Sequence, residues 1–395
     1  MRYYLKYLKG DAQIWMIVIL LMSFSLLTVY SFVPILVRIE GGSPSYYLGK
    51  HLVYVLLGFA CMFTVHRIQT KYFNQISQFV YYLAIALLVF TIFFGVKVNG
   101  AERWIRVFGL TFQSSDFAKL ALLMYLSKLL VKKEKLLDDW KGGVIPVIAP
   151  IFIICLLILK DNLSTALMLF SISFMLLFIA RFPWRKLFLI MLSIFASMLM
   201  FISVQEAFPD TQLARYQTWK ARIVRLWEQK QDPGASKIEN AQANNAKLAI
   251  FNGSLIGQGV GDGRLKSYIP EAYADFYFAS FIEEFGLLSG FVLAFTYIIL
   301  LLRIFRIAFK TEVLFESYLC LGIGIHLLMQ ASINMLVCVG FVPVTGQNMP
   351  FLAMGGSALI MACVSIGIVQ SIARNNNKLT ATATSFDYNE DEKTD

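Results

Sequence analysis

Three carboxylates stand in unusual surroundings in one stretch of the chain, YIPEAYADFYFASFIEEFGLLSG, residues 268–290. Asp275 lies at the start of a long apolar run, and Glu283 and Glu284 lie inside that run. A carboxylate at the mouth of such a run meets water and can exchange a proton with a bound hydroxyl group. A carboxylate deep in the run would cost a few kcal/mol in lipid, so it should face protein. The first position suits chemistry, and the other two suit structure.

The two glutamates cannot share one role if the run from 275 to 302 is a continuous helix. Glu283 would then lie about 12 Å deeper than Asp275. Around the helix axis, Glu283 would lie about 80° and Glu284 about 180° from Asp275. We predict that Glu283 pairs with Lys119 or another buried cation and that Glu284 stays protonated. Both glutamates are assigned as structural intramembrane charges.

A second group of charges lies in NGAERWIRVFGLTFQSSDFAKLALL, residues 99–123. Arg103 and Arg106 flank a tryptophan in a predicted outer loop. Asp116 and Lys119 follow at the start of the next apolar run, three residues apart, so they share a helix face and can pair. Two interpretations stay open: an interfacial anchor with a structural ion pair, or a cationic rim that holds a phosphate through the forked donors of arginine.

Two further polar stretches are predicted to lie at the same outer face. In LKDNLSTALMLF, Asp161 heads a group of four polar residues of the types that cap helix N-termini. The long segment 206–274 carries Lys247 and Lys266 on either side of the glycine-rich stretch GSLIGQGVGDG. Its residues 211–229 predict an amphipathic helix on the membrane surface. The glycines predict a closely approachable loop, but no strand precedes them, so a dinucleotide site is not expected.

The stretch VGFVPVTGQNMPFLAMGGSALI, residues 339–360, interrupts the apolar pattern. It contains two prolines, a Thr-Gly-Gln-Asn run that includes Gln347, and a Gly-Gly-Ser run. Irregular backbone at membrane depth is tolerated only where it is buried in protein or lines a wet cavity. We predict that this loop dips back toward such a cavity, with a plain turn between two helices as the alternative.

The elements that position these residues are predicted to be membrane helices. Of the 395 residues, 58% are hydrophobic and 15% charged, whereas a soluble protein would be about half apolar and about a quarter charged. A spanning helix needs about 20 apolar residues, and its backbone groups must pair within the segment. Ten runs qualify, at 13–36, 49–66, 77–96, 115–131, 144–159, 163–180, 187–205, 275–302, 313–339 and 350–373. The predicted fold is an all-α integral membrane protein, with its large outer loop between helices seven and eight.

Lysine and arginine in the short loops orient the chain. They are more frequent on the side of the N-terminus, which places both termini in the cytoplasm and the four charged stretches outside. The polytopic domain is predicted to cover residues 1–374, and a disordered cytoplasmic tail to cover 375–395. The net charge of +10 then indicates topology and affinity for anionic membrane lipids, not for nucleic acid. The five cysteines show no disulfide or metal-ligand spacing.

Four of these stretches carry a family resemblance. In order, NGAERWI…FQSSDFAKL, DNLSTA, GQGVG…IPEAYADFYFA…FIEEFG and VPVTGQNMPFLAMGGSAL resemble the signature stretches of the SEDS family, named for shape, elongation, division and sporulation. The likeness runs from the first predicted span to the last. The residues of these stretches are more similar to those of the division branch of the family than to those of its elongation branch.

The resemblance implies an activity and a partner. Members polymerise lipid II, the undecaprenyl-pyrophosphate-linked disaccharide-pentapeptide, outside the cytoplasmic membrane. They work with a class B penicillin-binding protein, which crosslinks the strands, and with other divisome proteins. The family's acidic residue falls on Asp275. The glutamate of its FQPSE motif is Asp116 here, and the proline is Ser114. The aspartate of its PDLGTA motif falls on Asn162, with the carboxylate one residue earlier at Asp161.

Glycan polymerisation needs a base for the acceptor hydroxyl and cations for the departing pyrophosphate. We assign Asp275 as the base. The substrate-binding candidates are Arg103, Arg106, Lys119, Lys247, Lys266, Asp116, Asp161 and Gln347. Mg2+ or Mn2+ could share the charge neutralisation, although no ligand spacing demands a metal. The alternatives are a lipid II flippase, with charges along a full crossing path, a non-catalytic division scaffold and, within the family, a role in elongation.

Overall fold

The computed structural model of the chain describes residues 8–98, 101–107, 110–160, 162–207, 237–269 and 272–391. Each of the ten predicted apolar runs falls on a helix. These helices are α1 (Ala12–Glu40), α2 (Pro44–Val65), α3 (Thr70–Phe94), α4 (Ser114–Lys133), α5 (Ile145–Leu159), α6 (Leu163–Ile179), α7 (Trp184–Ala207), α10 (Tyr277–Lys310), α11 (Leu314–Cys338) and α12 (Gly356–Asp391). The amphipathic helix predicted for 211–229 lies outside the described residues.

Eight helices in the described part of the chain are long and apolar enough to cross a membrane. Helix α6 is shorter, and α4 is too polar to be among the eight, because it carries charged residues near both ends. Its neighbours nevertheless bury α4 along most of its length. The chain is therefore an all-α, multi-pass membrane protein apart from one small sheet, while ten crossings stay a prediction.

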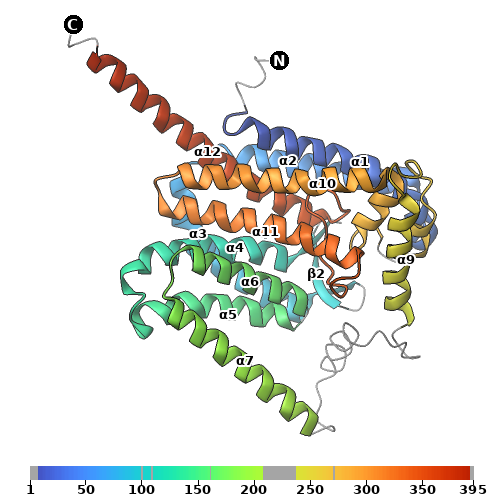
Figure 1. Cartoon of the computed structure of the whole chain (residues 1–395), viewed down its shortest axis with the longest axis horizontal. Helices are drawn as coiled ribbons and strands as arrows, with labels where there is room; N and C mark the ends of the chain where they lie inside the picture. Colours follow the sequence, from blue (N-terminus) through green and yellow to red (C-terminus); the bar gives the residue numbers. More distant parts are fainter. Residues whose placement is uncertain are drawn as a thin grey trace.

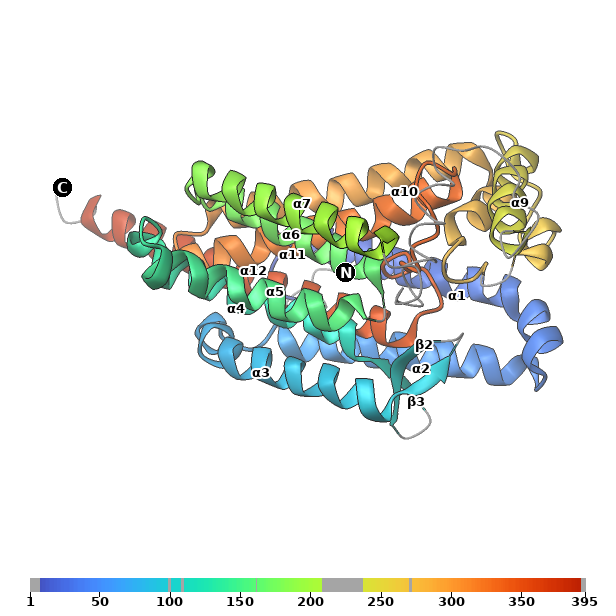
Figure 2. The same ribbon diagram turned by 90° about the horizontal axis from the view of Figure 1, so that it is seen from below.

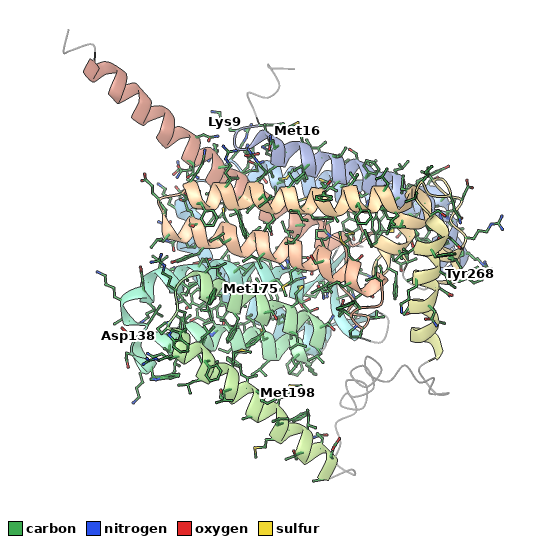
Figure 3. All side chains as sticks on the ribbon, viewed as in Figure 1. Lys9, Met16, Asp138, Met175, Met198 and Tyr268 are labelled. Carbon is green, nitrogen blue, oxygen red and sulfur yellow. The ribbon has the colours of Figure 1, made fainter. Side chains whose placement is uncertain are left out.

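The long helices run side by side, and the two ends of the bundle differ (Figures 1 and 2). Helix α9 (Lys237–Gly253) and the small sheet lie at one end, and the loop from α4 to α5 lies at the other. Tyr268 and Asp138 mark these two ends in Figure 3. We call the end with α9 the outer end, and the opposite one the inner end, which the positive-inside rule predicts to be cytoplasmic.

A small antiparallel sheet replaces the loop predicted around Arg103 and Arg106. Its strands are β1 (Val96–Val98), β2 (Ala101–Val107) and β3 (Leu110–Gln113), in the order β1-β2-β3. The sheet is fixed to the bundle because the backbone amide of Thr111 donates to the Tyr54 hydroxyl at 3.2 Å and that of Gln113 to Ser357 Oγ at 3.2 Å. The sequence contains an Asn-Gly pair between β1 and β2, which is a signal for a β-hairpin, and the predicted loop did not take it into account.

Helix α10 breaks within the EEFG motif, at Gly286, which has φ 84° and ψ 167°. Such a break leaves backbone groups on both sides without their helical partners. The glycine-rich loop after α9 supplies new ones. Four amides donate to four carbonyls across this junction: Gln258 to Glu283, Gly259 to Glu284, Leu287 to Ser254, and Leu288 to Leu255. The close approach predicted for the glycines is confirmed, and its partner is the backbone of α10.

Helix α12 continues past residue 374, where the membrane domain is predicted to end, and leaves the bundle (Figure 1). The backbone is helical through Asp391, which differs from the disorder predicted for the tail. Extending an existing helix adds one hydrogen bond per residue and needs no new nucleus, so a polar continuation can stay helical. The boundary at residue 374 stays a prediction.

Candidate active site

Asp275 lies in the turn that leads into α10, two residues before the helix begins at Tyr277. It is half-buried, and the Asn334 amide fixes its backbone, donating to its carbonyl at 3.0 Å and to that of Gln347 at 2.9 Å. The predicted place where the outer segment meets the helix is confirmed. The angles of 80° and 180° predicted for the glutamates are wrong, because Asp275 precedes the helix and shares no helical register with them.

The Asp275 carboxylate faces the loop that joins α11 to α12. Its Oδ2 lies 3.8 Å from the point where a Cβ would stand on Gly346, and Asn162 Nδ2 lies 3.8 Å from the same point. Gly346 has φ +68°, a left-handed conformation that favours glycine. The turn before α10, the start of α6 and this loop therefore bring a carboxylate and an amide donor together around a residue without a side chain.

Asn162 has a second role as the N-cap of α6. Its Oδ1 accepts from the backbone amide of Thr165 at 3.0 Å, which confirms the capping predicted for this polar group. Capping orients the carbonyl oxygen of the side chain toward the helix and turns the amide nitrogen toward Gly346. Asp161 lies outside the described residues, so its assignment stays a prediction.

The loop between α11 and α12 enters the protein interior, as predicted. Gln347, Met349, Phe351 and Leu352 are buried. The Gln347 amide donates to Thr165 Oγ1 at 2.7 Å, and the Tyr297 hydroxyl donates to the Pro350 carbonyl. The side chain of Gln347 is thus engaged within the protein, where it supports the wall of the site.

The candidate cations fall into two groups by exposure. Lys247 and Arg106 are exposed and form no ion pair with any side chain that the structure describes. Lys247 reaches from α9 to the loop of Gly346: its Nζ lies 2.7 Å from the point where a Cβ would stand on Gly340. The side chain of Arg103 lies outside the described part of the chain, so its role stays a prediction.

Lys119 and Asp116 form a buried ion pair. Lys119 Nζ lies 2.8 Å from Asp116 Oδ1, and the lysine is 4% exposed, which confirms the predicted pairing on one helix face. The Ser357 hydroxyl from α12 donates to Asp116 Oδ2 at 2.9 Å. Both charges are therefore held inside the bundle, and contact between Lys119 and a pyrophosphate stays a prediction that would require the pair to open.

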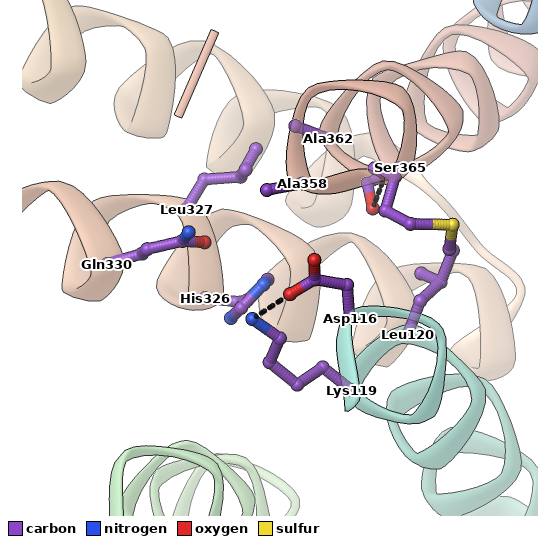
Figure 4. Close-up of a pocket in the computed structure, with 10 residues that line it drawn as sticks. Asp116, Lys119, Leu120, His326, Leu327, Gln330, Ala358, Ala362 and Ser365 are labelled. Carbon is purple, nitrogen blue, oxygen red and sulfur yellow. Dashed lines mark hydrogen bonds and ion pairs between the residues drawn. The ribbon is translucent and has the colours of Figure 1, made fainter. Parts of the chain in front are cut away.

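Figure 4 shows that His326 of α11 lies beside this ion pair, with Gln330 one turn further along the same helix. A cavity of about 10 Å³ lies between them and α12, roughly the space that one water molecule needs. His326 Nδ1 is buried and has no hydrogen-bond partner among the described residues.

Helix α11 carries a polar stripe that was not predicted. His326, Gln330 and Asn334 recur at every fourth residue, which places them on one helix face. The stripe leads from the buried ion pair at His326 to the Asp275 carbonyl at Asn334, a rise of about 12 Å. Three amide or imidazole side chains at this spacing inside an apolar run were the available signal.

The ion pair formed by the intramembrane glutamates differs from the predicted one. Glu284, not Glu283, pairs with a cation, and that cation is Lys266, which is 3% exposed. Lys266 Nζ and Glu284 Oε1 both bind the Ser31 hydroxyl of α1. Glu283 accepts from the backbone amides of Leu265 at 2.9 Å and Lys266 at 3.3 Å.

A buried carboxylate already neutralises Lys266, so contact between Lys266 and a pyrophosphate, as for Lys119, stays a prediction that would require the ion pair to open. The outer segment folds inward at this point, so that Lys266 lies between α1 and α10. Both glutamates are structural, as predicted. For a metal, the described residues offer no group of three or more His, Cys, Asp or Glu side chains.

Comparison with known proteins identifies a family and several relatives that are similar to this chain. Residues 11–378 match the family model of the cell cycle proteins FtsW, RodA and SpoVE. A Geobacter sulfurreducens protein named "Probable peptidoglycan glycosyltransferase FtsW" is 30% identical over 370 residues, which cover 92% of this chain and 95% of the relative. A protein of the same name from Neisseria gonorrhoeae is 27% identical and covers 94% of this chain and 86% of its own length.

Two solved structures share the fold. A chain from a peptidoglycan synthase complex, described as coordinating polymerization and crosslinking, aligns with a TM-score of 0.72 at 23% identity. The alignment covers 93% of this chain and 98% of that chain. The rod shape determining protein RodA of Thermus thermophilus aligns with a TM-score of 0.63 at 21% identity, over 93% of this chain and 97% of its own. The helical bundle described above is thus a known membrane fold.

Proposed function

We propose, from the premise that this chain belongs to the FtsW/RodA/SpoVE family of cell cycle proteins, that it is a peptidoglycan glycosyltransferase of the cytoplasmic membrane. Its substrate is lipid II, which it polymerises into glycan strands at the outer face. One observation carries the assignment of the site: the Asp275 carboxylate lies at the outer end of the bundle and faces Gly346 and the Asn162 amide.

In the proposed reaction, Asp275 is the general base. The acceptor's 4-hydroxyl gives its proton to the carboxylate while its oxygen forms a bond to the anomeric carbon of the donor sugar. The bond from that carbon to the pyrophosphate breaks, and undecaprenyl pyrophosphate leaves with the bonding electrons. A positioned base of this kind contributes about 10²- to 10⁴-fold to the rate.

The surroundings of Asp275 support this role. Asn334 holds the backbone of residue 275, which fixes the point from which its side chain extends. The Asn162 amide nitrogen lies on the same side of Gly346 and can donate to a sugar hydroxyl. Lys247, and Arg106 on the sheet, are exposed cations at the outer end and suit the charge that develops on the departing pyrophosphate.

The interior of α11 favours an enzyme over a flippase. The polar stripe runs from Asn334 to His326. Toward the inner end every buried position from Gly324 to Leu319 is apolar, and the next buried polar side chain is Glu316. A transporter for a charged headgroup would need polar groups along the full crossing path. The described polar groups of α11 are continuous only in the outer half.

A class B penicillin-binding protein is the proposed partner, and division is the proposed process. The support is indirect: one solved relative belongs to a complex that couples polymerization to crosslinking, and the curated relatives carry the name FtsW. A division role predicts that cells depleted of the protein grow into filaments. Rounding of rod-shaped cells would instead assign the protein to elongation.

The test uses the purified full chain, its penicillin-binding partner and labelled lipid II, with penicillin present to block crosslinking. We expect long glycan strands from the native protein and none from Asp275→Ala, while the variant keeps its unfolding temperature and its binding to the partner. Continued synthesis by the variant would remove the catalytic assignment. Inactive native protein, if it is folded and bound to its partner, would instead favour the scaffold.

A further inference from the structure

We propose that a groove at the inner end of the bundle, between α3, α4 and α5, binds the headgroup and part of an acyl chain of an acidic glycerophospholipid. The groove has a volume of about 360 Å³, and it lies far from Asp275. The residues that matter here are three lysines and three tyrosines, Lys128, Lys132, Lys133, Tyr81, Tyr82 and Tyr125. The inference is independent of the proposed enzyme activity.

The charge of the groove is positive and uncompensated. Lys128, Lys132 and Lys133 line it, and no carboxylate lines it. None of the three forms an ion pair with any side chain that the structure describes. Lys128 and Lys133 are half-buried, and Lys128 and Lys132 lie one helical turn apart, where like charges repel. A bound anion would remove this repulsion.

The dipole of α4 accounts for only part of this arrangement. Lys132 and Lys133 lie in the last turn of the helix, where cations are favourable because the C-terminal end carries partial negative charge. Lys128 lies one turn earlier, on a buried stretch of the helix, and gains little from this effect, which decays within the last turn. The helix dipole therefore does not explain the charge of Lys128, and an anion bound in the groove would.

Polarity changes along the groove in the way that an amphiphile requires. The lining begins near the inner end with Gln78, Pro146 and Lys133, and ends nearer the bilayer centre with Ile85 and Ile153. From Gln78 to Ile85, and from Pro146 to Ile153, each helix rises about 10 Å. A phosphate can therefore lie among the lysines while an acyl chain lies against the isoleucines.

The tyrosines give the groove a fixed wall. The Tyr81 hydroxyl donates to the Pro150 carbonyl at 3.3 Å, and its ring stacks on Tyr125 with 4.6 Å between the centroids. Tyr82 is 56% exposed at the edge of the groove, in keeping with the preference of tyrosine for the membrane interface. Basic pockets between helices on the cytoplasmic side suit acidic lipid headgroups.

A second basic pocket at the same end differs in one respect. It is lined by Arg303, Arg306 and Lys310, and its volume is about 280 Å³. Asp11 also lines it and pairs with Arg303, so part of its charge is already neutralised within the protein. This contrast favours the lysine groove as the site that requires an external anion.

The experiment compares two triple variants of the full chain that lose the same charge. The test variant is K128Q/K132Q/K133Q. The control, K71Q/K135Q/K141Q, removes three exposed lysines that do not line the groove. Each protein is reconstituted in nanodiscs of phosphatidylcholine with or without phosphatidylglycerol. The lipid retained after detergent extraction is counted by native mass spectrometry, and the unfolding temperature is measured in both membranes.

We expect phosphatidylglycerol to stay bound to the native protein and to the control, and to raise their unfolding temperatures. The test variant should retain at least about tenfold less of this lipid, because each lysine near the surface contributes a few-fold in affinity. Equal loss in both triple variants would overturn the proposal, since it would show nonspecific attraction. The proposal would also be overturned if millimolar inorganic phosphate raised the unfolding temperature of the native protein in phosphatidylcholine as much as phosphatidylglycerol does. The ligand would then be a soluble anion.

Ile153→Trp keeps all three lysines and tests the apolar end if the triple variant fails to fold. The larger side chain should fill the groove beside Ile85 and reduce the retained phosphatidylglycerol several-fold. Full retention of the lipid in this variant, with the fold intact, would contradict the placement of an acyl chain in the groove.

Discussion

Two groups of charge at the outer half of the bundle contrast in what surrounds them. Asp275 is half-buried and faces Gly346 and the Asn162 amide, and the exposed Lys247 reaches from α9 to the same loop; we call these residues the open group. Glu284 is sealed: it pairs with Lys266 and Ser31, and all three side chains are buried. A carboxylate that must accept a substrate proton needs the first arrangement, and a carboxylate that joins distant segments needs the second.

The contrast separates function from stability. The sealed group joins α1, the outer segment and α10, so its loss would expose or orphan a buried charge. In the open group, Asn334 holds the backbone of residue 275 whatever side chain stands there. We therefore expect substitutions in the open group to lower the polymerisation rate, and substitutions in the sealed group to lower the stability of the fold.

The largest expected effect is on catalysis, from Asp275→Asn. The amide keeps the size of the side chain but cannot accept the proton, so the polymerisation rate should fall about 10²- to 10⁴-fold. The unfolding temperature should stay within a few degrees of that of the native protein. Rates are measured with labelled lipid II, and unfolding by thermal denaturation in detergent. A large loss of stability would place Asp275 with the sealed group.

Lys266→Met should have the opposite effect, with a large loss of stability as its primary result. It leaves Glu284 buried without its cation, which costs about 3–5 kcal/mol in the free energy of unfolding. The double variant K266M/E284L should recover most of that loss, because replacing both partners of a buried ion pair by apolar residues is often close to neutral. Denaturation curves of the three proteins provide the check. No recovery in the double variant would show that the pair does more than neutralise charge.

Gly286→Ala tests the junction that holds the sealed group in place. A Cβ at 286 would stand 2.4 Å from the Leu255 carbonyl oxygen, at a φ of +84°. Strain of this kind costs about 1–3 kcal/mol. Gly49→Ala is the control, because a Cβ there meets no atom within 4 Å and alanine favours a helix. Equal stability of the two variants would contradict the tight contact.

The smallest expected effect comes from the rim of the open group. Lys247→Gln removes an exposed cation beside Gly340, and one such charge contributes up to about 1 kcal/mol. KM for lipid II should rise about threefold to fivefold, with less change in kcat, and Lys247→Arg should behave as the native protein does. High salt should reduce the difference. An unchanged KM would exclude Lys247 from the substrate-binding surface.

Local features were predictable from the sequence. The ten apolar runs specified where helices would form, because backbone groups in lipid must pair within their own segment. The Asp116–Lys119 pair was predicted because three residues of helix bring two side chains to one face. The Asn162 cap and the buried loop around Gln347 followed from residue types with strong local preferences.

Contacts between distant segments were not predictable in the same way. Lys266 reaches Glu284 only because the outer segment folds inward beside Ser31 of α1, and no local pattern encodes that path. The assumption of one continuous helix failed at Asp275 and at Gly286, where tertiary contacts replace helical hydrogen bonds. The sheet around Arg106 and the α11 stripe had local signals, an Asn-Gly turn and a fourfold polar spacing, that were not used.

The most direct test of the role of Asp275 separates binding from chemistry in one protein. Asp275→Asn is mixed with limiting labelled lipid II, and both the bound fraction and the single-turnover rate of coupling are measured, with Asp262→Asn, which removes an exposed carboxylate, as a charge-matched control. We predict native-like binding and a coupling rate reduced at least about 100-fold for Asp275→Asn. Coupling by this variant at the native rate would contradict the role of Asp275 as the base.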